Sequence, residues 1–150
     1  MTDDLAGEQA VRTMVARIAH TIDTRRWADL RALYADEVTT DYTSLFGGEV
    51  QRQDGDALIA GWKDLLGALD ATQHLVGPID VRLAGDAATA ECHVRGYHVR
   101  RGAPGGDEWM VAGQWIIRAA ERAGQWRVTA MTLRTFYETG NRRVLEVGRT

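Results

Sequence analysis

Three residues far apart in the sequence have side chains that can move a proton: Asp23, His74 and His98. An imidazole gains and loses a proton near neutral pH. A neighbouring carboxylate fixes which ring nitrogen carries that proton and stabilises the charged ring. If the fold brings the three side chains together, they form a site for general acid/base catalysis. These residue types alone do not identify a substrate.

Each of these residues also has an ordinary structural explanation. Asp23 ends an apolar helical stretch, where a carboxylate opposes the helix dipole unless a cationic or protic group faces it, although solvated aspartates are common there. His74 could begin a strand with a backbone partner, and His98 could be a core histidine with one hydrogen bond. Two histidines and a carboxylate are also a known metal-ligand set, but no short-spaced ligand pair supports a metal. His20, one turn before Asp23, could join the site or cover the helix edge.

The first half of the chain is patterned for helices. Apolar residues recur every three or four positions from Val11 to Ile22, which predicts a helix over 8–23. Capping and breaking residues predict the elements that follow: a helix over 25–34, a strand over 36–46, and a helix over 54–69.

After Thr72 the pattern changes to the two-residue period of β-strands. It predicts strands over about 73–84, 87–101, 108–121 and 125–138, with the first interrupted at Gly77-Pro78. Strands joined by short turns pair as antiparallel neighbours. We therefore expect a single domain over residues 1–150 of the α+β class, with helices packed on one face of a curved antiparallel sheet.

The alternation within 87–101 separates two histidines. The even positions carry small or apolar side chains up to His98, whereas the odd positions are mostly polar and include His93. Because successive strand residues face opposite sides of a sheet, His98 is expected on the covered face and His93 on the wetter face.

The amino-acid composition argues against several kinds of function. With 45% hydrophobic residues, 26% charged residues and a net charge of −3, the chain resembles an ordinary globular domain without a basic surface for nucleic acid. Cys92 is the only cysteine, so no intrachain disulfide can form. There is no signal-peptide pattern and no apolar run of membrane-spanning length. We therefore expect a cytoplasmic protein that binds neither nucleic acid nor membranes.

Five segments, in their order and spacing, resemble the SnoaL-like branch of the nuclear transport factor 2-like superfamily, and within it scytalone dehydratase-like bacterial proteins. The resemblance spans residues from about 10 to 138 and implies a cone-shaped sheet wrapped around N-terminal helices, a cystatin-like roll. The segments are Ile22-Asp23-Thr24-Arg25-Arg26-Trp27, Asp41-Tyr42-Thr43-Ser44, Thr72-Gln73-His74-Leu75-Val76-Gly77, Gly96-Tyr97-His98 and Gly124-Gln125-Trp126.

This resemblance implies roles for four residues. Asp23 and His74 match the family's catalytic Asp–His pair, which resembles that of lindane dehydrochlorinase as well. His98 matches the second histidine, and Tyr42 matches a tyrosine that helps to polarise the substrate carbonyl. Such relatives use no metal or organic cofactor. The match is incomplete, because Ile22 stands where scytalone dehydratase has a second tyrosine, and its pocket asparagine has no counterpart on the next strand.

The expected function is that of a cofactor-independent lyase, a dehydratase of a small cyclic or aromatic hydroxy-ketone that works in an apolar pocket. The same groups would suit an isomerase or a polyketide-type cyclase, which returns the proton to carbon instead of expelling water. A third reading is a non-catalytic module for small-ligand binding or dimerisation. The expected partner is a small apolar or aromatic molecule.

Two further expectations concern surfaces. The resemblance implies a homodimer or higher homo-oligomer through the outer sheet face, where Arg95, Tyr97 and Arg118 would suit a polar interface. The segment 139–150 contains three apolar residues, Val144, Leu145 and Val147. It could cover the pocket mouth or a dimer edge, or it could be a frayed tail.

Overall fold

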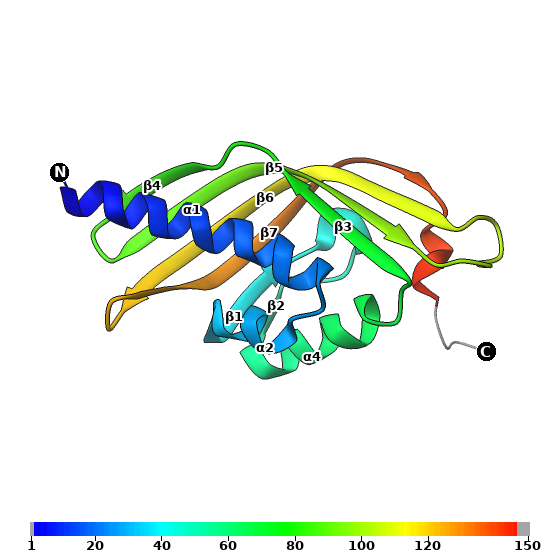
Figure 1. Ribbon diagram of the computed structural model, residues 1–150, viewed down its shortest axis with the longest axis horizontal. Coiled ribbons are helices and arrows are strands. Elements are labelled where there is room, and N and C mark those ends of the chain that lie inside the picture. Colours follow the sequence, from blue (N-terminus) through cyan, green and yellow to red (C-terminus); the bar gives the residue numbers. More distant parts are fainter. Residues whose placement is uncertain (1, 147–150) are drawn as a thin grey trace.

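The computed structural model describes residues 2–146, which form a long helix laid along a curved sheet, with shorter helices beside the C-terminal end of the long helix (Figure 1). None of the helices in this part of the chain is long and apolar enough to cross a membrane. The helices are α1 (Thr2–Asp23), α2 (Trp27–Ala32), α3 (Thr43–Phe46), α4 (Gly55–Leu66) and a 3-10 turn, η1 (Arg142–Leu145). The strands are β1 (Tyr34–Asp41), β2 (Gln51–Asp54), β3 (Ala71–Val76), β4 (Asp80–Ala84), β5 (Ala87–Val99), β6 (Glu108–Arg122) and β7 (Gln125–Gly140).

The strands form one sheet in the order β2-β1-β7-β6-β5-β3, and β4 also pairs with β5. As predicted, the strands joined by short turns are antiparallel neighbours. The predicted curved antiparallel sheet is confirmed, with one exception that was not predicted: β1 runs parallel to β7. Register shifts within the β6–β7 pair mark β-bulges, which bend and twist a sheet. The order leaves β2 and β3 at opposite edges of the sheet.

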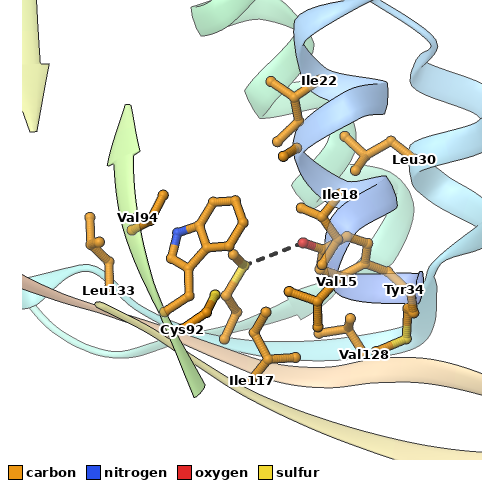
Figure 2. Close-up of a cluster of buried hydrophobic side chains, with 14 of the residues drawn as sticks. Val15, Ile18, Ile22, Leu30, Tyr34, Cys92, Val94, Ile117, Val128 and Leu133 are labelled. Atoms are coloured by element: carbon orange, nitrogen blue, oxygen red, sulfur yellow. Dashed lines mark hydrogen bonds between the residues drawn. The ribbon is translucent and has the colours of Figure 1, made fainter. Parts of the chain in front are cut away.

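The predicted alternation in β5 is confirmed. Every even position from Ala88 to His98 is buried, whereas the odd positions are exposed or half-buried. The buried row faces the apolar stripe of α1, whose members are at most 4% exposed from Val11 to Ile22. Figure 2 shows side chains of α1 and of the sheet packed together, among them Val15, Ile18, Ile22, Cys92, Ile117 and Val128. Burying each large apolar side chain contributes about 1.5–3 kcal/mol, so α1 is firmly seated.

Several predicted boundaries were wrong. The strand expected over 36–46 ends at Asp41, whose carboxylate accepts hydrogen bonds from the backbone and hydroxyl of Thr43 and so starts the turn of α3. β2 was missed because its sequence, Gln-Arg-Gln-Asp, has no apolar alternation, and it joins the edge of the sheet by pairing with β1. The strand expected over 73–84 is two strands, β3 and β4, separated at the predicted Gly77-Pro78 interruption. The first helix begins earlier than predicted, and α2 is shorter than the predicted 25–34.

Gly113 is required where the β6–β7 pair bends. A Cβ atom there would lie 2.3 Å from the backbone oxygen of Arg134, which cannot move without disturbing the strand pairing. We expect Gly113→Ala to lower the free energy of unfolding by about 1–3 kcal/mol, as measured by urea denaturation. Gly61→Ala is the control, because a Cβ there meets nothing within 4 Å on α4. That change should stabilise by up to about 1 kcal/mol, and an equal loss in both variants would contradict the argument.

Candidate active site

The C-terminal end of α1 is held in place by Arg25. This residue has a φ of 60°, a left-handed conformation that ends the helix directly after Asp23 and Thr24. Its guanidinium donates hydrogen bonds to the carbonyl of Leu66, the last residue of α4, at 2.6 Å and to the carbonyl of Leu69, just after α4, at 3.2 Å. The position of the Asp23 carboxylate is therefore set by two helices at once.

Asp23 and His74 meet in a double hydrogen bond. Asp23 Oδ2 accepts from the backbone N–H of His74 at 2.6 Å, and Asp23 Oδ1 lies 2.8 Å from His74 Nδ1. The Thr72 hydroxyl donates to the same Oδ1 at 3.0 Å. These three hydrogen-bond donors offset the unfavourable interaction between the Asp23 carboxylate and the negative end of the α1 dipole. Because an ionised carboxylate only accepts, His74 carries its proton on Nδ1, and its Nε2 keeps a free lone pair.

The charge state of Asp23 follows from the same contacts. Burial tends to raise the pKa of its carboxyl group, but the hydrogen bonds from His74, the positive charge that His74 has when protonated, and the Thr72 hydroxyl outweigh burial and lower the pKa overall. Asp23 is therefore ionised at neutral pH. It orients His74 and stabilises an imidazolium there, and it does not take the proton itself.

The His74 ring lies between Trp115 and Gly96. It stacks on Trp115, with ring centroids 5.9 Å apart and an interplanar angle of 28°. Gly96 pairs with His74 across β3 and β5, and a Cβ at position 96 would lie 3.3 Å from His74 Nε2 and 3.2 Å from His98 Cε1. The missing side chain leaves Nε2 open toward the cavity that His74, Gly96 and His98 all line.

His98 lies edge-on to His74, with ring centroids 5.8 Å apart, and is only 6% exposed. Burial, with a smaller effect of the charge that His74 has when protonated, lowers the pKa of His98 to about 4. The ring is therefore neutral at pH 7. Its Nδ1 lies 3.4 Å from the carbonyl oxygen of Trp109, a long contact that favours the proton on Nδ1. His98 Nε2 is then an acceptor, so His98 can orient a hydroxyl group but does not protonate it.

The cavity has a volume of about 300 Å³ and lies between the inner face of the sheet and the helices α3, α4 and η1. Among the described residues, no Asp, Glu, Lys or Arg lines it. Its polar side chains are His74, His98, Tyr42, Thr40 and Gln53. Its large apolar walls include Leu58, Trp62, Leu66, Val94, Trp109 and Trp115.

Tyr42 lies in the same cavity, directly after β1. Its ring meets Trp62 edge to face, with centroids 6.4 Å apart, and its hydroxyl lies 3.7 Å from the weakly accepting sulfur of Met131. Burial raises the pKa of Tyr42, so its hydroxyl stays protonated and is able to donate a hydrogen bond. Tyr34, fully buried, places its hydroxyl 3.3 Å from the same sulfur but does not line the cavity.

The structure therefore brings Asp23, His74, His98 and Tyr42 to one cavity or its edge. His20 is exposed and lies apart from them, and His93 is on the outer sheet face, 5.8 Å from Phe136 between ring centroids. Within the described residues, no group of three or more His, Cys, Asp or Glu side chains is placed to hold a metal ion.

Three polar residues of the site, Thr72, Thr40 and Gln53, were not predicted from the sequence. Thr72 lies on the same strand face as His74, so the two-residue period could have predicted that both side chains face Asp23. The positions of Thr40 and Gln53 in the cavity wall could not be predicted from the sequence, because they depend on β1 and β2, whose boundaries were not predicted.

The C-terminal segment covers part of the cavity. Val144 is fully buried and Leu145 lines the cavity, which agrees with one of the expectations for residues 139–150. The guanidinium of Arg142 lies 5.7 Å from the ring centroid of Phe46 and 5.8 Å from that of Trp109. Val147 lies outside the described residues.

The SnoaL-like domain model matches residues 3–132. Protein Kfla4162 from Kribbella flavida has a solved structure that is 25% identical, with a TM-score of 0.87 over 95% of this chain and 99% of that one. A candidate scytalone dehydratase from Novosphingobium aromaticivorans is 22% identical, with a TM-score of 0.79 over 94% of this chain and 92% of that one.

Hexachlorocyclohexane dehydrochlorinase LinA-type3 from Novosphingobium barchaimii shares the fold at 14% identity, with a TM-score of 0.78 over 94% of each chain. No curated protein matches the sequence significantly. The similarity to LinA and to the candidate dehydratase is one of fold.

Proposed function

The chain belongs to the SnoaL-like domain family, and on that premise we propose that it is a cofactor-independent lyase that dehydrates a small cyclic or aromatic hydroxy-ketone. The observation that carries the proposal is the Asp23–His74 pair, which presents a free imidazole nitrogen to a cavity without charged side chains among the described residues. Two of the fold neighbours are named for dehydration and dehydrochlorination, which are both eliminations.

The proposed reaction uses one base twice. His74 Nε2 takes a proton from the carbon next to the ketone, and the electron pair moves into an enolate whose oxygen accepts a hydrogen bond from Tyr42. The enolate then re-forms the carbonyl, the neighbouring carbon–oxygen bond breaks, and the departing hydroxyl takes the proton from His74 Nε2 and leaves as water. His98 Nε2 accepts a hydrogen bond from that hydroxyl and orients it. An apolar cavity makes these hydrogen bonds stronger than they would be in water.

The function is tested with 3-hydroxy-1-tetralone, whose dehydration gives 1-naphthol. Mass spectrometry of the product distinguishes dehydration from isomerisation, because a dehydratase removes one water and an isomerase leaves the mass unchanged. We expect loss of water faster than in buffer alone and faster than with His74→Ala. Equal rates in all three samples across a panel of monocyclic and bicyclic β-hydroxy-ketones would contradict the proposal.

Gly96 offers a separate test of the open face of His74. In Gly96→Ala the added methyl would lie 3.3 Å from His74 Nε2, where substrate must approach. We expect kcat to fall on the order of 10- to 100-fold, the usual effect of a misplaced reacting group. The free energy of unfolding should change by less than about 1 kcal/mol, because alanine suits a strand at least as well as glycine. An unchanged kcat would show that the reaction does not take place over Gly96.

A further inference from the structure

The cavity carries polar side chains on two sides that come from opposite edges of the sheet. His74 and His98 are supplied by β3 and β5, whereas Thr40 and Gln53 are supplied by β1 and β2. In the sheet order β2 and β3 are the two ends, and the curvature seen in Figure 1 brings both edges to the same cavity. The proposed proton transfer uses the β3 side together with Tyr42 and gives Thr40 and Gln53 no role.

Thr40 and Gln53 are placed to act together. Gln53 pairs with Val38 and Thr40 pairs with Gln51, so Thr40 and Gln53 are diagonal neighbours on the same face of the β1–β2 pair. Diagonal residues of this kind lie about 7–8 Å apart, close enough to bind the same small group. Their side chains therefore form one polar patch in an otherwise apolar part of the wall.

The hydrogen-bonding capacity of this patch is unused. No group within residues 2–146 forms a hydrogen bond with the Thr40 hydroxyl or with the Gln53 amide, and neither is among the fully buried polar atoms of this part of the chain that lack a partner, so both are open to the cavity or to solvent. A polar group in an apolar environment costs free energy unless it finds a partner. A ligand that displaces water from this part of the cavity avoids that cost only if it bonds to these side chains itself.

The chemistry of the patch limits what it can bind. A hydroxyl and an amide each donate and accept, which suits a neutral hydroxyl, carbonyl or amide. A carboxylate or phosphate would enter a cavity with no Arg or Lys among its described lining residues, and would lose its hydration without a compensating cation. The volume of about 300 Å³ is twice that of the roughly 150 Å³ cavities known to hold benzene, so two rings fit.

We propose that Thr40 and Gln53 form a second recognition site, which binds a neutral hydrogen-bonding substituent on the part of the substrate remote from the reacting carbon. The substrate class is then an uncharged compound of one or two rings that is polar at both ends. The assignment of the reacting end rests on the proposed function, but binding at this patch does not.

The test measures binding and not turnover. Isothermal titration calorimetry would compare 1-tetralone, 6-hydroxy-1-tetralone and 6-carboxy-1-tetralone, none of which has a leaving group that can be eliminated. Wild type should bind the hydroxyl compound about 3- to 10-fold more tightly than 1-tetralone, the usual gain from one hydrogen bond. The carboxylate should bind at least about 10-fold more weakly than the hydroxyl compound.

The variants assign this preference to the patch. Gln53→Leu should bring the ratio of the two affinities close to one, and Thr40→Val should reduce it. Gln51→Leu, on the same strand but outside the cavity lining, should keep the wild-type ratio. The proposal is overturned if wild type does not discriminate, if Gln53→Leu keeps the preference, if the carboxylate binds best, or if no tetralone binds. Failure of the dehydratase assay alone would leave these binding results intact and would count only against the reaction.

Discussion

Asp23→Asn is expected to reduce kcat on the dehydration substrate by about 10²–10⁴-fold without unfolding the protein. Asp23 receives three donors, from His74 N–H, His74 Nδ1 and the Thr72 hydroxyl. An asparagine has one oxygen and one NH₂ group, so it cannot accept on both sides. If its NH₂ group faces His74 Nδ1, the imidazole proton moves to Nε2, and the base is lost.

The controls for this prediction separate chemistry from structure. Thr72→Val removes one donor but leaves both His74 contacts, so its effect on kcat should be within about 10-fold. His74→Ala should match the loss in Asp23→Asn, and the double variant should be little worse, because the two residues act as a unit. Circular dichroism would verify that each variant is folded. Full activity in Asp23→Asn or His74→Ala would exclude this mechanism.

Sequence periodicity predicted the parts of the site that depend on local pattern. The stripe of α1 ends at Asp23, and the alternation of β5 placed His98 on the covered face and His93 on the outer face, as the structure has them. Both patterns arise from residues close in sequence, where the helical and strand repeats determine which face each side chain takes.

The other side of the cavity could not be predicted in this way. β2 is a four-residue polar strand that has no pattern of its own, and it is identified by its pairing with β1. Gln53 therefore reaches the cavity only because β2 pairs with β1, and α3 separates these two strands in the sequence. The parallel β1–β7 pair depends similarly on long-range packing, because these strands are separated by most of the chain.

The second large effect is a loss of stability in mild acid, caused by His98. Its pKa is lowered from an ordinary value of 6.5 to about 4 in the folded protein, mainly by burial. Between these two values the unfolded chain binds a proton that the folded protein does not, so lowering the pH favours unfolding. The stability from His98 is thus complete above about pH 6.5 and is lost by about pH 4, a difference of about 3 kcal/mol. Asp23 acts in a separate window, because its lowered pKa gives stability that is lost only as the pH falls below 3.8.

Urea denaturation at several pH values from 7 to 4.5 would measure this effect as the slope of the free energy of unfolding against pH. His98→Gln should flatten that slope, whatever its stability at pH 7, because the titrating group is gone. His74 and Asp23, the titratable groups nearest to His98, remain in both proteins. His93→Gln, which removes an exposed histidine from the outer face, is the matched histidine-to-glutamine control. An equal slope in wild type and His98→Gln would mean that His98 accepts a proton in the folded protein, and it could then act as an acid toward the leaving group instead of only orienting it.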